Sequence, residues 1–355
     1  PKTAQVSCKF TSNKLKAAPV QLAINKLSSY SSGAKAFLIN AGNANAATGQ
    51  QGMKDVKSYC KAIASELNLK EENVIPFSTG VIGEALPVNN YLSAFQEANT
   101  KLSPKNWAKA ANAILTTDTK PKIISKKITI GKQTFSITGF AKGSGMIAPN
   151  LATMLSFIFT DAKISSKVLQ NCLKYAVDRS FNCISVDGDT STSDTVLLSA
   201  TGQAKGQLKI QSANDRVLKK FRVALNEMTT ELALMIVRDG AATGNLLTCD
   251  VVGAVSQRAA RNIGRSIVNS TLVRKGIFGA EPRVGRIVMA VGKAGERAER
   301  DLLSISIGEV LVAEAGETLA NFDEGAVISH LKSNQVHFTI DIGLGRGKAR
   351  VWSAL

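Results

Sequence analysis

The sequence lacks the patterns that mark disulfide-stabilised, zinc-binding and membrane proteins. Its five cysteines lie far apart and none belongs to a CxxC pair, so we expect reduced thiols and neither a disulfide framework nor a zinc site. No apolar signal region opens the chain, and no hydrophobic run reaches the length of a membrane span. The sequence therefore predicts a cytoplasmic protein with no membrane partner, no metal and no other cofactor.

Histidine and aromatic residues are scarce as well. The two histidines, His330 and His337, lie late in the chain with no serine or cysteine motif nearby, so a Ser–His–Asp mechanism is not indicated. Aromatic residues make up 5% of a chain that is 44% hydrophobic, so small aliphatic side chains must form most of the core. With 355 residues, the chain is long enough for two domains or one large one.

Acidic residues are outnumbered by basic ones, 27 to 44, which gives a formal net charge of +17. An excess of positive charge is typical of proteins that bind nucleic acid or an anionic surface. The lysines and arginines are scattered over predicted helix faces, however, and no long basic run is interleaved with aromatic residues. We therefore expect a solvated basic surface and no nucleic-acid partner, with anionic substrates as the lesser interpretation.

Apolar periodicity predicts strands that alternate with helices along the chain, as is typical of an α/β or α+β fold. The expected strands are residues 34–40, 74–77, 123–130, 133–140, 154–160, 195–201, 246–255, 286–291, 304–315 and 336–341. The expected helices are residues 53–67, 91–98, 106–115, 165–181, 215–237, 258–268 and 323–331. Only Gly131-Lys132 separates the strands at 123–130 and 133–140, which predicts a hairpin.

The most informative stretch is KGSGMIAPNLATML at residues 142–155. Its glycines permit backbone angles closed to other residues, and its proline fixes one angle. The loop would thus bring the Thr153 hydroxyl to the start of an apolar strand. That arrangement suits a nucleophile, and it suits self-cleavage of the Ala152–Thr153 bond, after which the α-amine of Thr153 can serve as its own base. A threonine at a loop–strand junction is also common without such a role.

This stretch closely resembles the self-processing site of the bifunctional ornithine acetyltransferase/glutamate N-acetyltransferase family of arginine biosynthesis. Three further strings resemble the same family in the same order: NAGNANAATG at residues 40–49, STGVIGE at 78–84 and SVDGDTST at 185–192. Long ordered motifs over nearly the whole chain are highly specific. The resemblance implies a layered helix/sheet sandwich with two lobes, of the α/β (α+β) class.

The resemblance also implies an activity, an acetyl transfer from N-acetylornithine to glutamate. The acyltransferase would cleave itself between Ala152 and Thr153 and then carry the acetyl group on the Thr153 hydroxyl. Residues 1–152 would form an α chain with the oxyanion residues, and residues 153–355 a β chain that begins at the nucleophile. The implied assembly is a cytoplasmic heterotetramer of two α and two β chains, and the use of acetyl-CoA as a second donor is left open.

Further site residues follow from the same resemblance. Thr79 and Gly80 match the family's oxyanion hole, where a hydroxyl and a backbone N–H can point at a developing negative charge. Lys142 matches a lysine that binds substrate, and a cation could hold the α-carboxylate of an amino acid. Thr119 matches a substrate-contacting threonine, with neighbouring Thr117 as a competitor. Without the resemblance, residues 78–80 could equally form a simple Ser-Thr-Gly turn, and Lys142 could be an ordinary exposed lysine beside a glycine turn.

Two polar segments are interpreted as structural support. Asn40, Asn43 and Asn45 favour tight side-chain-to-backbone turns near the site. Asp187, Asp189 and Asp194 do not have the spacing of a calcium loop, so helix capping or bracing of the backbone is the expected role.

The sequence departs from the family pattern in its second half. The family's glutamate and lysine after the long helix are Ala241 and Asn245 here, and its Pro-Asn-Trp-Gly-Arg has Arg283 and Val284 in place of Asn and Trp. The chain starts at a proline and stops at Leu355, before the family's last substrate contacts, so we expect a trimmed product that lacks the opening strand. Self-cleavage should be intact and acetyl transfer weakened.

Two other functions remain open from the sequence. A related N-terminal-nucleophile amidohydrolase would release the acyl group to water, and an assay for free acetate would separate it from a transferase. A non-catalytic homologue would only bind anions through its basic surface, in a salt-sensitive manner.

Overall fold

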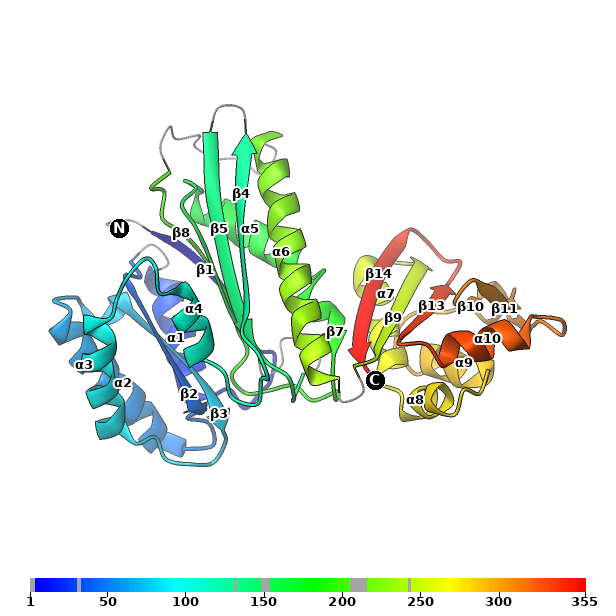
Figure 1. The fold of residues 1–355 in the computed structure, drawn as a ribbon, viewed down its shortest axis with the longest axis horizontal. Coiled ribbons are helices and arrows are strands. Elements are labelled where there is room, and N and C mark those ends of the chain that lie inside the picture. Colours follow the sequence, from blue (N-terminus) through cyan, green and yellow to red (C-terminus); the bar gives the residue numbers. More distant parts are fainter. Residues whose placement is uncertain (1–3, 31–32, 131–132, 148–153, 205–215, 242–243) are drawn as a thin grey trace. The chain divides into compact units, whose positions relative to one another are not determined.

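The computed structural model describes residues 4–30, 33–130, 133–147, 154–204, 216–241 and 244–355 (Figure 1). The chain divides into two compact units. Unit 1 comprises residues 1–146, 150–180 and 189–232, and unit 2 comprises residues 147–149, 181–188 and 233–355. Helices and strands are mixed in both units, which agrees with the predicted α/β (α+β) class.

Unit 1 contains a five-stranded sheet with the order β1-β8-β6-β5-β4. The strands are β1 (Gln5–Phe10), β8 (Thr195–Ala200), β6 (Leu155–Thr160), β5 (Gln133–Lys142) and β4 (Lys122–Ile130). β6 and β8 run parallel and the other neighbours antiparallel. The pairing of β4 with β5 confirms the predicted hairpin. Strand β1, by contrast, opens the described chain where the sequence predicted no strand.

A second, two-stranded sheet of unit 1 packs on the first. Its strands, β2 (Ala36–Asn43) and β3 (Val74–Val81), are parallel. The rings of Phe77 on β3 and Phe157 on β6 meet edge to face with their centroids 5.2 Å apart. Ile75, Phe140 and Leu197 are buried in the same cluster, so the space between the two sheets is an apolar core.

Helices pack around both sheets of unit 1. They are α1 (Ala18–Tyr30), α2 (Gly49–Glu66), α3 (Val88–Thr100), α4 (Trp107–Ala113), α5 (Ser166–Val177) and α6 (Arg216–Gly240), with short 3-10 turns η1 (Glu71–Asn73) and η2 (Phe181–Cys183), the latter in unit 2. α1 and α2 pack on β3, α3 packs on α2, and α5 packs on β1 and β8. Met228 and Leu232 of α6 lie against Gly139 of β5. The unit is thus a layered helix–sheet–sheet–helix sandwich, as expected (Figure 1).

Unit 2 is built on a seven-stranded sheet with the order β12-β11-β10-β13-β9-β14-β7. The strands are β12 (Glu317–Thr318), β11 (Val310–Glu314), β10 (Ser304–Ile307), β13 (Gln335–Asp341), β9 (Leu246–Ala254), β14 (Gly347–Ala354) and β7 (Ile184–Ser185). The helices are α7 (Gln257–Val268), α8 (Thr271–Phe278), α9 (Val284–Gly292) and α10 (Glu324–Leu331), with a 3-10 turn η3 (Arg300–Leu302). α7 lies on β9 and β14, where a Cβ on Gly264 would come within 2.7 Å of Val351.

Three predictions about unit 2 were wrong. The segment 286–291 is not a strand but the core of α9, because Val284, Ile287 and Val291 recur at helical spacing and are all buried. The single strand expected at 304–315 is the pair β10 and β11, which turn at Gly308 with a φ of +59°. β13 is not the last strand, since β14 follows it and pairs with β9 and β7. Helices α1 and α8 were not predicted.

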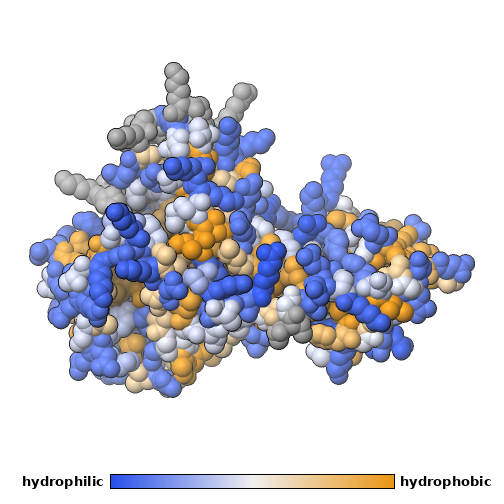
Figure 2. Space-filling view, viewed as in Figure 1, coloured by the Kyte–Doolittle hydropathy of each residue, from blue (hydrophilic) through white to orange (hydrophobic). Residues whose placement is uncertain are grey.

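The remaining composition-based expectations concern thiols and surface. All five cysteines are free, as predicted. The face seen in Figure 2 is mostly hydrophilic, with small apolar patches between the polar side chains. Among the described helices, none is both long enough and apolar enough to cross a bilayer. In the same residues, no three His, Cys, Asp or Glu side chains gather as metal ligands would.

Candidate active site

A buried polar cluster lies in unit 1, near the carboxyl ends of β3 and β5 and the start of β4. Thr79, Lys122 and Lys142 are each only 1% exposed. Lysine is almost never fully buried without a partner, because removing an ammonium group from water costs free energy that only hydrogen bonds or an anion can offset. Two such lysines in one place therefore mark a specialised site.

The Lys142 ammonium group donates hydrogen bonds to two threonine hydroxyls. Its Nζ donates to Oγ1 of Thr79 at 3.1 Å and to Oγ1 of Thr116 at 2.8 Å. Burial lowers the pKa of Lys142 below its ordinary value, while the nearby Asp118 carboxylate acts in the opposite direction and favours the charged form. The lysine is thus fixed in place beside the end of β3.

Asp118 connects the loop after α4 to both neighbouring strands. Its Oδ1 accepts a hydrogen bond from Lys122 Nζ at 2.6 Å and another from the backbone N–H of Gly143 at 2.6 Å. The Lys122 and Asp118 side chains are 1% and 0% exposed, so this ion pair is fully desolvated. Thr117 and Ser144 join the same two segments through their hydroxyls, 2.7 Å apart. The start of the 142–155 loop is therefore anchored at successive residues.

Gly80, near the end of β3, allows the backbones of β3 and β2 to come unusually close. Gly80 has a φ of +133°, and a Cβ there would lie 2.2 Å from the backbone carbon of Gly42 on the paired strand β2. The two backbones can approach this closely only because Gly80 has no side chain. Next to them, the Ser78 hydroxyl donates to Oδ1 of Asn40 at 2.5 Å.

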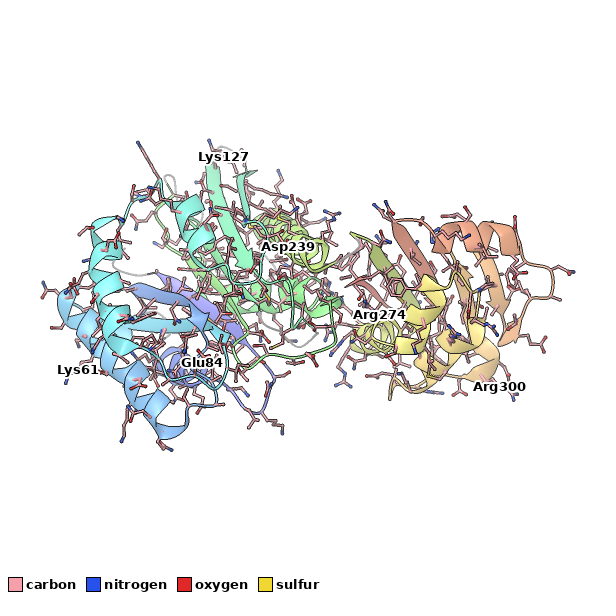
Figure 3. All side chains as sticks on the ribbon, turned by 60° about the horizontal axis from the view of Figure 1, so that its bottom comes forward. Lys61, Glu84, Lys127, Asp239, Arg274 and Arg300 are labelled. Carbon is pink, nitrogen blue, oxygen red and sulfur yellow. The ribbon has the colours of Figure 1, made fainter. Side chains whose placement is uncertain are left out.

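The asparagine-rich loop after β2 supports the STGVIGE segment, as predicted. Asn43 Nδ2 donates to the carbonyls of Glu84 and Ala85, each at 3.2 Å. The N–H of Ala44 donates to Val81 O at 2.9 Å. A cavity of about 440 Å³ opens beside this loop, lined by residues 40–43 and 84–87 together with residues 90, 91 and 94. Glu84, labelled in Figure 3, is an exposed carboxylate on its wall.

Asp187 and Asp194 each accept a hydrogen bond from a backbone N–H group, which agrees with the supporting role that the sequence analysis predicted. Oδ1 of Asp187 accepts from the N–H of Ile147 at 2.9 Å, and Oδ1 of Asp194 accepts from the N–H of Met154 at 3.0 Å. Asp194 is fully buried, and burial raises its pKa well above the ordinary value, although the bond from Met154 opposes that shift. Burial therefore favours the neutral form of the carboxyl group that accepts from Met154, the residue directly after the nucleophile candidate.

Comparison with known proteins identifies the family. Residues 1–354 match the ArgJ family. The chain belongs to the ArgJ family. It is 44% identical to the arginine biosynthesis bifunctional protein ArgJ of Gluconobacter oxydans over 320 residues, 90% of this chain and 75% of that protein. Its identity to the ArgJ protein of Agrobacterium fabrum is 42% over 354 residues, 99% of this chain and 85% of that protein.

The fold agrees with this membership. The crystal structure of the arginine biosynthesis bifunctional protein ArgJ of Bacillus halodurans is similar to 55% of this chain, with a TM-score of 0.51 and 30% identity, and 90% of that chain is covered. ArgJ membership confirms the family that the four motifs predicted, and with it the enzyme class, an acyltransferase.

The structure brings together some of the family-matched residues. Thr79, Gly80 and Lys142 lie in one cluster, where Thr116 also contacts Lys142. Thr116 and Thr119 are both exposed, and the role of Thr119 stays a prediction. Ala152 and Thr153 lie outside the described residues, so their roles stay predictions. The sequence analysis missed Thr116, Asp118 and Lys122, although an aspartate and a lysine four residues apart in a polar string could have indicated an ion pair.

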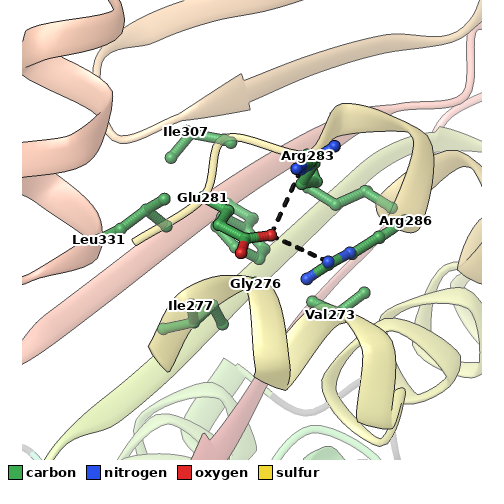
Figure 4. Close-up of a pocket in the computed structure, with 10 residues that line it drawn as sticks. Val273, Gly276, Ile277, Glu281, Arg283, Arg286, Ile307 and Leu331 are labelled. Carbon is green, nitrogen blue, oxygen red and sulfur yellow. Dashed lines mark hydrogen bonds and ion pairs between the residues drawn. The ribbon is translucent and has the colours of Figure 1, made fainter. Parts of the chain in front are cut away.

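Unit 2 holds the positions that depart from the ArgJ pattern. Ala241 is half-buried just after α6, and its carbonyl accepts from Gly244 at 3.1 Å. Arg283 Nε lies 3.3 Å from Glu281 Oε2, which also accepts from Arg286 at 2.9 Å (Figure 4). The adjoining cavity holds only about 10 Å³, room for a single water molecule. Arg283 thus serves a local ion-pair network.

Proposed function

We propose that this ArgJ chain transfers an acetyl group from N-acetylornithine to glutamate, with Thr153 as the nucleophile. Thr153 would become the first residue of a β chain, residues 153–355, by cleavage of the Ala152–Thr153 bond. The proposal includes the cytoplasmic assembly of two α and two β chains inferred from the family resemblance. The observation that carries it is the buried cluster of Thr79, Lys142 and Asp118.

The register of unit 1 supports this use of the cluster. Lys142 pairs across the sheet with Leu155, the second residue after Thr153. The side chain of the same lysine reaches Thr79 Oγ1 at the end of β3. The N–H of Met154, which is covalently joined to the Thr153 carbonyl, is held by Asp194. The two residues that follow the proposed nucleophile are thus tied to the strand that carries the lysine and to a buried carboxyl.

The chemistry needs a base, a nucleophile and an oxyanion site. The α-amine of Thr153 removes the proton from its own hydroxyl, whose oxygen attacks the acetyl carbonyl of N-acetylornithine. The Thr79 hydroxyl and the Gly80 N–H donate to the oxyanion that forms. The C–N bond then breaks, ornithine leaves with the proton, and an acetyl-threonine ester remains. The amine of glutamate attacks this ester in the same manner and restores the hydroxyl.

The test is an assay that follows both products. Purified protein is incubated with N-acetylornithine and glutamate, and N-acetylglutamate and free acetate are measured by mass spectrometry. We expect N-acetylglutamate in excess over acetate, and we expect Thr79→Val to slow its formation by about a hundredfold or more. Acetate without N-acetylglutamate would instead establish the amidohydrolase alternative. Replacing N-acetylornithine by acetyl-CoA tests the second donor.

A further inference from the structure

The buried cluster of unit 1 holds more positive than negative charge. The side chains of Lys122, Lys142 and Asp118 are all buried. Burial raises the pKa of Asp194, the other acid that acts on Lys142, well above its ordinary value and so favours its neutral form. With both lysines protonated, two ammonium groups meet one carboxylate, and an anionic ligand can balance the excess.

We propose that Asp118 is a positioning residue for substrate binding, which keeps Lys142 charged and in place to bind the substrate carboxylate, and that Lys122 stops Asp118 from taking up the Lys142 ammonium itself. The inference rests on the proposed function, because it takes Lys142 as the group that binds the α-carboxylate of N-acetylornithine. It assigns roles to Asp118 and Lys122, which act through Lys142.

Asp118 fixes the backbone on both sides of the lysine. Its Oδ1 accepts from the backbone N–H of Gly143, the residue after Lys142, at 2.6 Å. Its Oδ2 accepts from the backbone N–H of Thr116 at 3.3 Å. The hydroxyl of Thr116 in turn accepts from Lys142 Nζ at 2.8 Å. One carboxylate therefore orders both the main chain that carries the lysine and a hydroxyl that the lysine contacts.

The direct hydrogen bonds of Lys142 hold its ammonium group without cancelling its charge. They go to the neutral hydroxyls of Thr79 and Thr116, which use two of the three N–H donors and leave one for a ligand. Lys122 Nζ, by contrast, donates directly to Asp118 Oδ1 at 2.6 Å. Without Lys122, the Asp118 carboxylate would attract the Lys142 ammonium and compete with a substrate carboxylate for it.

The charge of Lys142 depends on Asp118 and Lys122 in opposite directions. Burial lowers the pKa of Lys142, the Asp118 carboxylate raises it, and the Lys122 ammonium lowers it again. Asp194, when ionised, acts in the same direction as Asp118. Removing the charge of Asp118 and removing that of Lys122 should therefore have opposite effects on the protonation of Lys142.

The experiment measures kcat/KM for N-acetylornithine against pH in processed wild type, Asp118→Asn and Lys122→Met. Asp118→Asn keeps an oxygen for the Gly143 N–H and removes the charge. We expect the alkaline limb, on which Lys142 loses its proton, to move by about one pH unit or more, downward in Asp118→Asn and upward in Lys122→Met. KM should rise about tenfold or more in Asp118→Asn, while kcat changes by no more than about threefold.

A control variant, Lys127→Met, removes an exposed lysine from β4, the strand that begins at Lys122 (Figure 3). It should match wild type in KM, kcat and the position of the alkaline limb. A purely structural role of the ion pair would reduce the folded fraction of Asp118→Asn and Lys122→Met and leave the limb of the remaining enzyme where it is in wild type.

A second measurement does not depend on turnover. The NMR signal of the isotope-labelled ε-carbon of Lys142, assigned by its loss in Lys142→Arg, is followed against pH and should shift as the alkaline limb does. If Asp118→Asn does not fold, Asp118→Asn combined with Lys122→Met replaces it, and its titration should lie at lower pH than that of Lys122→Met. Titrations that stay at the wild-type pH, or that move in the same direction in both single variants, overturn the inference. Wild type that forms no N-acetylglutamate while these titrations shift as expected would reject the proposed function and still support the coupling of Lys142 to Asp118 and Lys122.

Discussion

Gly80 is the residue at which backbone geometry constrains the site most directly. Its φ of +133° is closed to other residues, and a Cβ would collide with the backbone of Gly42 at 2.2 Å. Backbone cannot move aside as a flexible side chain does. We expect Gly80→Ala to lower the free energy of unfolding by about 3 kcal/mol or more, or to prevent accumulation of folded protein. Urea titration followed by circular dichroism measures this loss.

Gly83 supplies the matched control for that substitution. Its φ is also positive, +91°, but no atom lies within 4 Å of a Cβ placed there. Gly83→Ala should therefore show only the conformational cost, about 1 kcal/mol. Equal losses in the two variants would contradict the claim that the approach of β2 to β3 requires glycine at position 80.

Asp194 should make stability depend on pH. Burial raises its pKa in the folded state, so the folded protein binds a proton that the unfolded chain releases above a pH of about 4. Stability is therefore fully present below that value and falls as pH rises toward the folded-state pKa, by up to about 1.4 kcal/mol per pH unit. Asp194→Asn keeps an oxygen that can accept from the Met154 N–H, but the amide group does not titrate in this pH range. In urea titrations at pH values from 4 to 8, the free energy of unfolding should decline less with rising pH for the variant than for wild type.

At the scale of elements, Asp118 joins the loop after α4 to β4 and to the end of β5. Removing it takes the carboxylate at 2.6 Å away from the buried Lys122 ammonium and also removes the acceptor of the Gly143 N–H. Breaking a buried ion pair from one side typically costs about 3–5 kcal/mol, and we expect Asp118→Ala to lose stability on that order. Chemical denaturation is the measurement.

Two further variants test whether the ion pair is the cause. Asp118→Ala combined with Lys122→Met removes both charges and should recover a large part of the loss, because no uncompensated charge remains. Glu97→Ala removes the anion of the exposed pair with Lys101 and should leave the denaturation midpoint unchanged. A double variant no more stable than Asp118→Ala would show that the Gly143 contact dominates.

The end of α6 bears on the level of activity. In the proposed transfer, the acceptor amine must lose a proton as it attacks the acetyl-threonine, and the methyl group of Ala241 cannot assist. General acid–base help is worth roughly a hundred- to ten-thousand-fold, so Ala241→Glu should raise kcat for N-acetylglutamate formation by about tenfold or more. Ala241→Gln has a similar size and no carboxylate, and it should not raise kcat. Equal rates in the two variants would assign the gain to packing.

Element prediction succeeded where periodicity and turn signals agreed and failed where they did not. The β4–β5 hairpin follows from two alternating runs on either side of a glycine. Helix α6 follows from apolar residues that recur at helical spacing along its whole length. Residues 286–291 are rich in β-branched side chains, but burial at positions 284, 287 and 291 selects a helix.

The cluster around Lys142 shows the limit of sequence reasoning at the site. Motif resemblance identified Lys142 and Thr79, but it could not indicate that the two side chains bond to each other across 63 positions. The resemblance named Thr119, whose role stays a prediction, and no periodicity among the polar residues of that loop could indicate the contact that Thr116 makes with Lys142. The partner of a buried lysine is decided by tertiary packing, which a single sequence does not reveal.

At the scale of the whole molecule, the proposed cleavage separates segments that share one sheet. Strand β5 would belong to the α chain and β6 to the β chain, yet they pair from Ile137 and Thr160 to Lys142 and Leu155. Strand β1 of the α chain likewise pairs with β8 of the β chain along its whole length. Cutting the connection leaves these ladders and the apolar core between the sheets intact. The two products should therefore stay associated without any covalent link.

This association and the cut itself can be read from one preparation. We expect a single species in gel filtration that resolves into two bands in denaturing electrophoresis, one of which starts at Thr153. Thr153→Ala should give one uncut band of 37.6 kDa, because the methyl group cannot attack the preceding carbonyl. Thr153→Ser keeps a hydroxyl and should still process. Two normal-sized fragments from Thr153→Ala would reject this residue as the internal nucleophile, whereas dissociation of the wild-type fragments without denaturant would show that the shared sheet does not hold the chains together.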